Sequence, residues 1–96
     1  MDTQSLRLFV LASETLNISA AGRTLGMAPA VASTRIAKLE RLLGAELLHR
    51  STRKISLSSE GQDFLPYARE MIAQEEAALA ALEVVDLGRA LTEGGL

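Results

Sequence analysis

The chain has no cysteine among its 96 residues and a single histidine, His49. The missing thiols exclude disulfide scaffolds, cysteine nucleophiles and cysteine-ligated zinc, and one imidazole cannot form a metal-binding cluster. No apolar run approaches the roughly 18 residues of a membrane span, and the N-terminus lacks the pattern of a signal peptide. Because 48% of the residues are hydrophobic and 23% are charged, we expect one small soluble domain in the cytoplasm, without a membrane partner.

Features of an enzyme are missing as well. The sequence has no glycine-rich phosphate-binding loop, no cluster of metal ligands and no plausible nucleophile–base pair. A hydrolase that uses paired carboxylates is rejected because the carboxylates cluster on one predicted helix face. We therefore predict no enzymatic activity and no cofactor or metal, and a packing or hydrogen-bonding role for His49.

Positive charge is concentrated in the middle of the chain, although the net charge is −2. Residues 19–59 carry seven Arg or Lys against two Glu, a net charge of +5, whereas residues 60–96 carry a net charge of −6. A phosphate responds to the local field and not to the charge of the whole chain. The basic middle therefore permits a polyanionic partner.

Apolar residues recur every three or four positions in the first half of the chain, as in amphipathic helices. They predict a first helix over 3–15, capped by Asp2 or the threonine that follows it. Ser19 is expected to cap a second helix over 20–25, which ends at Gly26.

A third helix is predicted over 29–43, because Pro29 is favoured in the first turn of a helix and Gly44 favours its end. The residues expected on its buried face are Val31 or Ala32, Ile36, Leu39, Leu42 and Leu43.

Two short β-like stretches, 47–48 and 55–57, flank the polar run 50–54 and predict a small hairpin with a basic tip. Ser58 or the next serine then caps a long helix that is expected to run to about Leu87. Pro66 falls inside this helix and predicts a modest bend or a later start.

The order of these elements predicts a mainly α-helical winged helix-turn-helix followed by a long linker or dimerisation helix. The corresponding regions are a DNA-binding domain over 1–58, the long helix over 59–88 and a frayed tail over 89–96. The major groove of duplex DNA is wide enough for one α-helix, and the basic tip would lie at the neighbouring minor groove. The residues predicted to contact bases or phosphates are Ser19, Ala28, Pro29, Ala30, Ser33, Thr34, Arg35, Lys38, Arg50, Arg53 and Lys54.

Residues 19–40, SAAGRTLGMAPAVASTRIAKLE, resemble the helix-turn-helix of LysR-type transcriptional regulators. The resemblance continues through 42–50, LLGAELLHR, and 51–61, STRKISLSSEG, and covers about residues 2–87. It implies an N-terminal DNA-binding domain whose long helix pairs two subunits, in the bacterial cytoplasm and on the nucleoid when bound. It also implies a C-terminal domain that binds a small-molecule effector. This sequence does not contain that domain, so a shortened form or an unusually short relative is expected.

Four positions depart from the family's pattern. Gly22 stands where alanine is usual, and glycine within a helix costs roughly 0.5–1 kcal/mol relative to alanine. Ala28 and Ala30 replace residues with hydroxyl groups, and Thr34 stands where arginine, a bidentate reader of guanine, is frequent. DNA binding remains the prediction, but the target sequence cannot be inferred.

A stripe of apolar residues along the long helix points to a second helix. The part beyond Ile72 extends past so small a domain, because each residue advances the helix by about 1.5 Å. We predict a homodimer whose interface includes Met71, Ile72, Leu79, Leu82 and Val85. A tail that folds back over the first helix would satisfy the same pattern.

The sequence therefore predicts a sequence-specific double-stranded DNA-binding domain that acts as a homodimer on an inverted repeat. Its recognition helix, about 29–43, enters the major groove, and its wing, 50–54, lies at the minor groove. A winged helix that binds protein is disfavoured because Thr34, Arg35 and Lys38 are polar. Arg50 keeps two interpretations, a DNA contact or a structural ion pair with Glu46 or Glu40.

Overall fold

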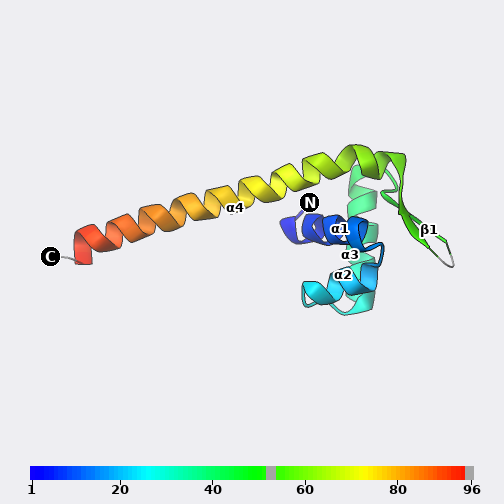
Figure 1. Ribbon diagram of the computed structural model, residues 1–96, viewed down its shortest axis with the longest axis horizontal. Helices are drawn as coiled ribbons and strands as arrows, with labels where there is room; N and C mark the ends of the chain where they lie inside the picture. The colour runs from blue at the N-terminus through cyan, green and yellow to red at the C-terminus, as the bar shows by residue number, and fades with distance from the viewer. Residues whose placement is uncertain (52–53, 95–96) are drawn as a thin grey trace.

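The computed structural model describes the backbone of residues 1–51 and 54–94 and the side chains of residues 1–51 and 54–83. The elements follow one another as α1 (Thr3–Thr15), α2 (Ile18–Thr24), α3 (Pro29–Leu43), β1 (Leu48–Arg50), β2 (Ile55–Leu57) and α4 (Ser59–Gly94). In Figure 1 the first three helices form a body, the hairpin projects from it on one side and α4 extends far beyond it on the other. This arrangement confirms the predicted winged helix-turn-helix with a long final helix. Within the described residues, every helix is too short or too polar to cross a membrane.

Helices α1 and α2 begin at side-chain caps. The Asp2 carboxylate accepts a hydrogen bond from the Ser5 backbone N–H at 2.7 Å, as predicted. For α2 the predicted cap, Ser19, is wrong: Asn17 Oδ1 accepts from the Ala20 N–H at 3.0 Å, and Ser19 lies in the first turn. Asparagine caps a helix as well as serine does. Asn17 precedes Ser19 in the chain, so α2 starts earlier than predicted.

The turn between α2 and α3 depends on two glycines. Gly26 has a φ of 74°, a conformation that a residue without Cβ adopts readily. Gly22 lies where the helices touch, and a Cβ there would lie 2.7 Å from the Cβ of Ala32. The departure from alanine at position 22 therefore has a packing reason, because it lets α2 and α3 approach closely.

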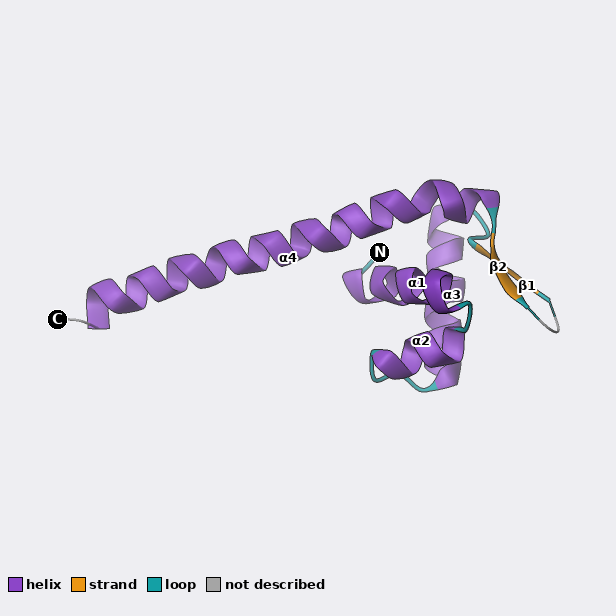
Figure 2. Ribbon diagram, viewed as in Figure 1, coloured by secondary structure: helices purple, strands orange, loops and turns teal. Residues whose placement is uncertain are grey.

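The core lies between the three short helices, the hairpin base and the start of α4 (Figure 2). The Phe9 and Phe64 rings pack with their centroids 5.8 Å apart. Val31 and Ala32 were the alternatives for the buried face of α3. Ala32 faces this core and Val31 is 48% exposed, so Ala32 is the buried residue. The prediction for Leu42 is wrong, since this side chain is 61% exposed. Successive residues turn by about 100° around a helix of 3.6 residues per turn, which places Leu42 beside the buried row and not on it.

The hairpin pairs β1 with β2 in antiparallel register, with Leu48 opposite Leu57. Ser58 follows directly and caps α4: its Oγ accepts from the Gly61 N–H at 2.8 Å and donates to the Glu46 carbonyl at 2.5 Å. The same serine therefore ends the hairpin, starts the long helix and ties both to the segment between α3 and β1.

Helix α4 contains Pro66 without interruption, so a later start is wrong. The backbone stays helical to Gly94, past the predicted end near Leu87, so the tail predicted to fray from residue 89 is helical as far as Gly94. Helical hydrogen bonds continue because no proline or capping turn stops them there.

The first part of α4 packs along α1. Glu75, which interrupts the apolar stripe, accepts a hydrogen bond from the Thr3 hydroxyl and pairs with Arg7 at 3.5 Å. Arg7 also pairs with Glu76 at 3.1 Å, and Arg69 pairs with Glu14 at 3.3 Å. Beyond these contacts α4 projects from the body, and the molecule measures 64 × 26 × 20 Å. The helix therefore does not fold back over α1 beyond this point.

Candidate nucleic-acid interface

The start of α3 is exposed on the side away from the core. Ala28, Pro29, Ala30, Ser33 and Thr34 are all exposed. Buried between them, Ala32 anchors the helix to the body, followed by Ile36 and Leu39. The Thr34 hydroxyl donates to the Ala30 carbonyl at 2.9 Å, so its oxygen and its methyl group remain for an outside partner.

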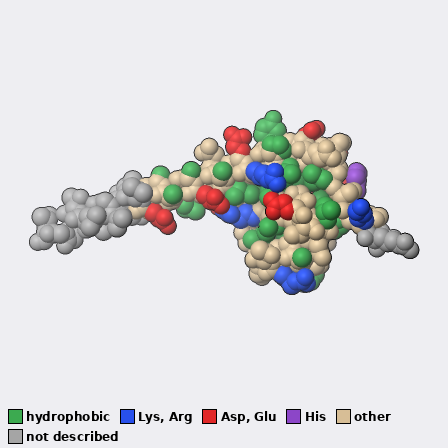
Figure 3. Space-filling model, in the orientation of Figure 1, with side chains coloured by type: hydrophobic (Ala, Val, Ile, Leu, Met, Phe, Trp, Pro, Cys, Tyr) green, Lys and Arg blue, Asp and Glu red, His purple; other side chains and the backbone are tan. Residues whose placement is uncertain are grey.

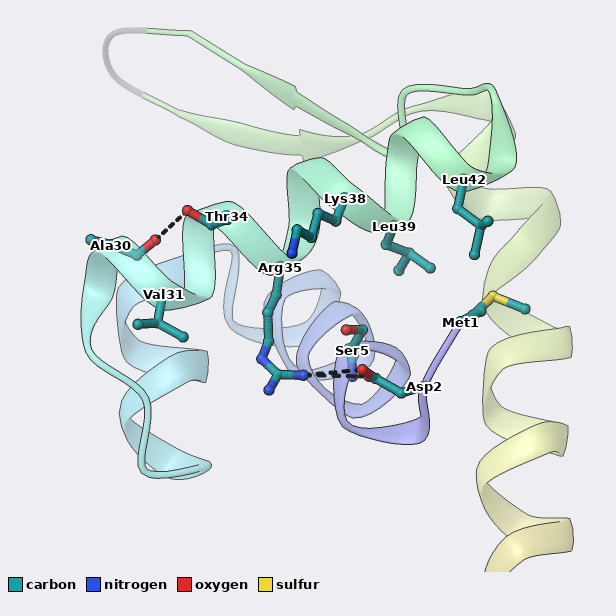
Figure 4. A pocket seen from close by; sticks show the side chains of 10 residues that line it. All are labelled: Met1, Asp2, Ser5, Ala30, Val31, Thr34, Arg35, Lys38, Leu39 and Leu42. Carbon is teal, nitrogen blue, oxygen red and sulfur yellow. Dashed lines mark hydrogen bonds and ion pairs between the residues drawn. The ribbon is translucent and has the colours of Figure 1, made fainter.

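Three polar residues of α3 line one groove together with the N-terminus of α1 (Figure 4). They are Thr34, Arg35 and Lys38, and the groove has a volume of about 690 Å³. Lys38 is exposed. Three large apolar side chains of the groove were not predicted to lie there: Met1, Val31 and Leu42, which are 58%, 48% and 61% exposed.

Arg35 is not free in this groove. Its Nη1 lies 3.3 Å from Oδ2 and 3.4 Å from Oδ1 of Asp2, and its side chain is 36% exposed. Hydrogen bonding from the Ser5 backbone N–H, then from the Ser5 hydroxyl, lowers the pKa of Asp2, and the charge of Arg35 acts in the same direction. The carboxylate is therefore ionised at neutral pH. Sequence reasoning assigned Asp2 only a capping role, because nothing local indicates its proximity to α3.

At the wing, Arg50 forms a structural ion pair. Its Nη2 lies 3.2 Å from Glu40 Oε1, whereas Glu46 pairs with His49 at 3.0 Å, which confirms a hydrogen-bonding role for that histidine. Of the two partners left open by the sequence, Glu40 is therefore the one observed. The Arg50 side chain remains 40% exposed, so the pair does not remove it from the surface. Lys54 is exposed, and Arg53 lies outside the described residues.

Ser19 is half-buried. It lies in the first turn of α2, apart from the other predicted contacts of the helix-turn-helix, which lie at the start of α3 and along it. In Figure 3 the visible face shows Lys and Arg side chains next to Asp and Glu, and not one uninterrupted basic surface.

The residues of the predicted dimer interface fall into two groups. Met71 and Ile72 are half-buried against the chain's own core. Leu79 and Leu82 lie beyond the body and are 56% and 59% exposed. The Val85 side chain lies outside the described residues.

A short helix, a tight turn and a second helix with an exposed start, next to a hairpin that carries basic residues, form a winged helix-turn-helix DNA-binding domain. Residues 3–62 match the family described as bacterial regulatory helix-turn-helix protein, lysR family. The chain belongs to this family.

Known relatives agree with this assignment. The chain is 36% identical over 95 residues to the Hca operon transcriptional activator HcaR of Escherichia coli, covering 98% of the chain and 32% of the relative. It superposes on Vibrio fischeri DarR in complex with DNA with a TM-score of 0.82 and 29% identity, over 93% of this chain and 30% of that one. It also superposes on the BenM DNA-binding domain in complex with catB site 1 DNA, again with a TM-score of 0.82, at 28% identity over 90% and 97% of the two chains.

The chain thus spans about a third of the length of HcaR and of DarR. It corresponds to nearly the whole of the separate BenM DNA-binding domain. The family and its relatives are transcriptional regulators, so the chain is a LysR-type DNA-binding domain and not an enzyme.

Proposed function

We propose that the domain binds an inverted-repeat operator as a homodimer, with α3 in the major groove and the wing at the adjacent minor groove. The observation that carries this proposal is the exposed start of α3. Every residue from Ala28 to Thr34 is exposed except Ala32, which faces the core. In helix-turn-helix proteins the first turns of the second helix contact base edges.

The candidate contact residues divide by chemistry into two roles. Ser33 and Thr34 carry hydroxyl oxygens that hydrogen-bond to base edges, and the apolar surface of Ala28, Pro29 and Ala30 contacts thymine methyl groups. The remaining candidates are cations or a hydroxyl suited to phosphate oxygens. They are Ser19, Arg35, Lys38, Arg50, Arg53 and Lys54.

The test of base reading starts with selection of bound duplexes from a random pool, which yields the operator, its symmetry and its spacing. Ser33→Ala and Thr34→Ala are expected to change the preference among operator variants, with about 1–3 kcal/mol lost at the contacted base. Uniform loss across all sequences would contradict base reading. Arg53→Ala should instead weaken all duplexes and reduce the salt slope by about one.

The proposal of a dimer through α4 rests on the exposure of Leu79 and Leu82. These leucines continue the side of α4 that, in its N-terminal part, packs on α1. Two apolar side chains of this size on a helix that leaves the body need a partner surface, and an identical helix provides one. The wing and α3 of each subunit would then reach successive half-sites.

The dimer is tested by replacing both leucines with glutamine and measuring the mass by sedimentation equilibrium. Loss of the dimer and of preference for two half-sites over one is expected. Ala77→Gln with Ala80→Gln is the matched control, since both alanines are exposed on other sides of α4. A leucine variant that stays dimeric would refute this interface.

A further inference from the structure

One acidic side chain lies among the cations of the groove at α3. The Asp2 carboxylate lines this groove with Arg35 and Lys38 (Figure 4), and both of its oxygens lie within 3.4 Å of Arg35 Nη1. Of the described residues that line the groove, Asp2 is the only acid. A fixed negative charge at this place competes with a phosphate for the neighbouring cation.

The position of this carboxylate is set by the start of α1. Oδ1 accepts the Ser5 backbone N–H at 2.7 Å, so the side chain cannot turn away from the groove without losing the helix cap. The capping bond thus holds the acid in place, and the acid holds the flexible Arg35 side chain across the groove towards α1. A lysine or arginine that is neutralised by an acid does not release a counterion from DNA as a free one does.

We propose that Asp2 sets the DNA affinity of the domain by restraining Arg35 and withholding one cation from phosphate contact. This inference rests on the proposed function, in which α3 faces DNA. Because binding without sequence preference depends on phosphate contacts, the restraint lowers the attraction to any duplex. It thereby leaves a larger share of the binding energy to the base contacts of α3.

The test compares the wild-type chain with Asp2→Asn on a duplex of random sequence, with binding followed by fluorescence anisotropy. Asparagine caps a helix as well as aspartate does, so the substitution removes the charge and keeps the cap. One additional phosphate contact steepens the plot of log affinity against log salt by about 0.9. Between about 50 and 200 mM salt, this slope amounts to an additional change in affinity of about three- to four-fold.

Glu14→Gln is the matched control. It removes the same charge from α1 and breaks an ion pair of the same length, 3.3 Å between Glu14 and Arg69, on the side that faces α4. Its salt slope is expected to equal that of the wild type. A further comparison, Asp2→Asn in an Arg35→Gln background, should show no steepening, because the cation that Asp2 restrains is gone.

An unchanged slope for Asp2→Asn, or the same change for Glu14→Gln, would overturn the inference. Steepening that persists in the Arg35→Gln background would also overturn it, since the effect would then not pass through Arg35. The proposed function is judged separately by Ser33→Ala and Thr34→Ala on the selected operator. If these weaken binding while Asp2→Asn has no effect, only the present inference fails; if neither has an effect, α3 is not the DNA-binding helix.

Discussion

Glu40 joins the recognition helix to the wing, and its replacement by alanine is expected to destabilise the domain strongly. Its Oε2 accepts hydrogen bonds from the backbone N–H groups of Leu47 at 2.8 Å and Leu48 at 3.3 Å. Its Oε1 accepts from Arg50 Nη2 at 3.2 Å. The side chain is only 13% exposed, so water cannot readily take its place.

The size of the effect follows from these three contacts. A hydrogen bond to a charged group contributes about 1.5–3 kcal/mol, and a buried donor left without an acceptor costs about 1–3 kcal/mol. The bond to Leu47 is short, the bond to Leu48 is long, and the half-exposed Arg50 adds about 0–1 kcal/mol. We expect Glu40→Ala to lower the free energy of unfolding by about 2–4 kcal/mol. Glu40→Gln keeps one acceptor oxygen and should lose about 1–2 kcal/mol.

The assay is urea unfolding followed by circular dichroism, combined with amide hydrogen exchange at Leu47 and Leu48. Both amides should exchange faster in Glu40→Ala, which distinguishes loss of this anchor from a general loss of stability. Glu46→Ala is the control, because that carboxylate is 60% exposed and pairs with His49; it should change stability by less than about 0.5 kcal/mol. Equal stability of the two variants, with both amides still protected in Glu40→Ala, would refute the role of Glu40.

Three further substitutions probe the junction between the hairpin and α4 and the start of α1. Gly61→Ala should lower the free energy of unfolding by about 3 kcal/mol or more, because its Cβ would lie 2.2 Å from the Leu47 carbonyl oxygen; an unchanged melting temperature would contradict this. Ser58→Ala removes the acceptor of the Gly61 N–H and should cost about 1–2 kcal/mol in urea unfolding, whereas a loss too small to measure would disprove the cap. The Ser5 N–H lowers the pKa of Asp2 below 3.8, so this stabilisation is present above pH 3.8 and disappears as the pH falls through the lowered pKa. Melting temperatures measured against pH should therefore converge on those of Asp2→Asn in acid, and parallel curves would exclude the linkage.

The elements could be predicted where their signals are local. Pro29 is the first residue of α3 and Gly44 caps its end, and the predicted bounds of this helix are those observed. The α2 cap was wrong because asparagine and serine cap equally well, and sequence alone does not decide between Asn17 and Ser19. The predicted burial of Leu42 was wrong because a spacing of three or four residues defines a broad apolar stripe, and only the packed body shows where the edge of that stripe lies.

The pairing of the cations could be predicted only in part, because their partners are distant in the chain. Asp2 and Arg35 are 33 residues apart, and only the packing of α1 against α3 brings them together. For Arg50, ten residues from Glu40, the sequence named this pair but left it open beside Glu46 and a DNA contact, because the choice depends on how the segment between α3 and β1 folds. Charge counted along the sequence therefore identifies the basic segment but overstates how much of it is unpaired.

The two paired cations should respond differently to DNA, and the difference lies in their acids. Exposed ion pairs contribute about 0–1 kcal/mol, and the Asp2 carboxylate is 63% exposed. On a duplex of random sequence the pair keeps Arg35 from phosphate contact, whereas on the operator, where base contacts hold α3 in the groove, a phosphate can replace Asp2 as the partner of Arg35. Glu40 is mostly buried and fixed by two backbone N–H groups, so it stays in place when DNA arrives. Any contact between Arg50 and DNA is then made while Arg50 is still bound to Glu40, and that carboxylate orients the exposed edge of the guanidinium. Operator binding would thus exchange the ion pair at α3 and preserve the one at the wing, which makes Arg35 the adjustable contact and Arg50 the fixed one.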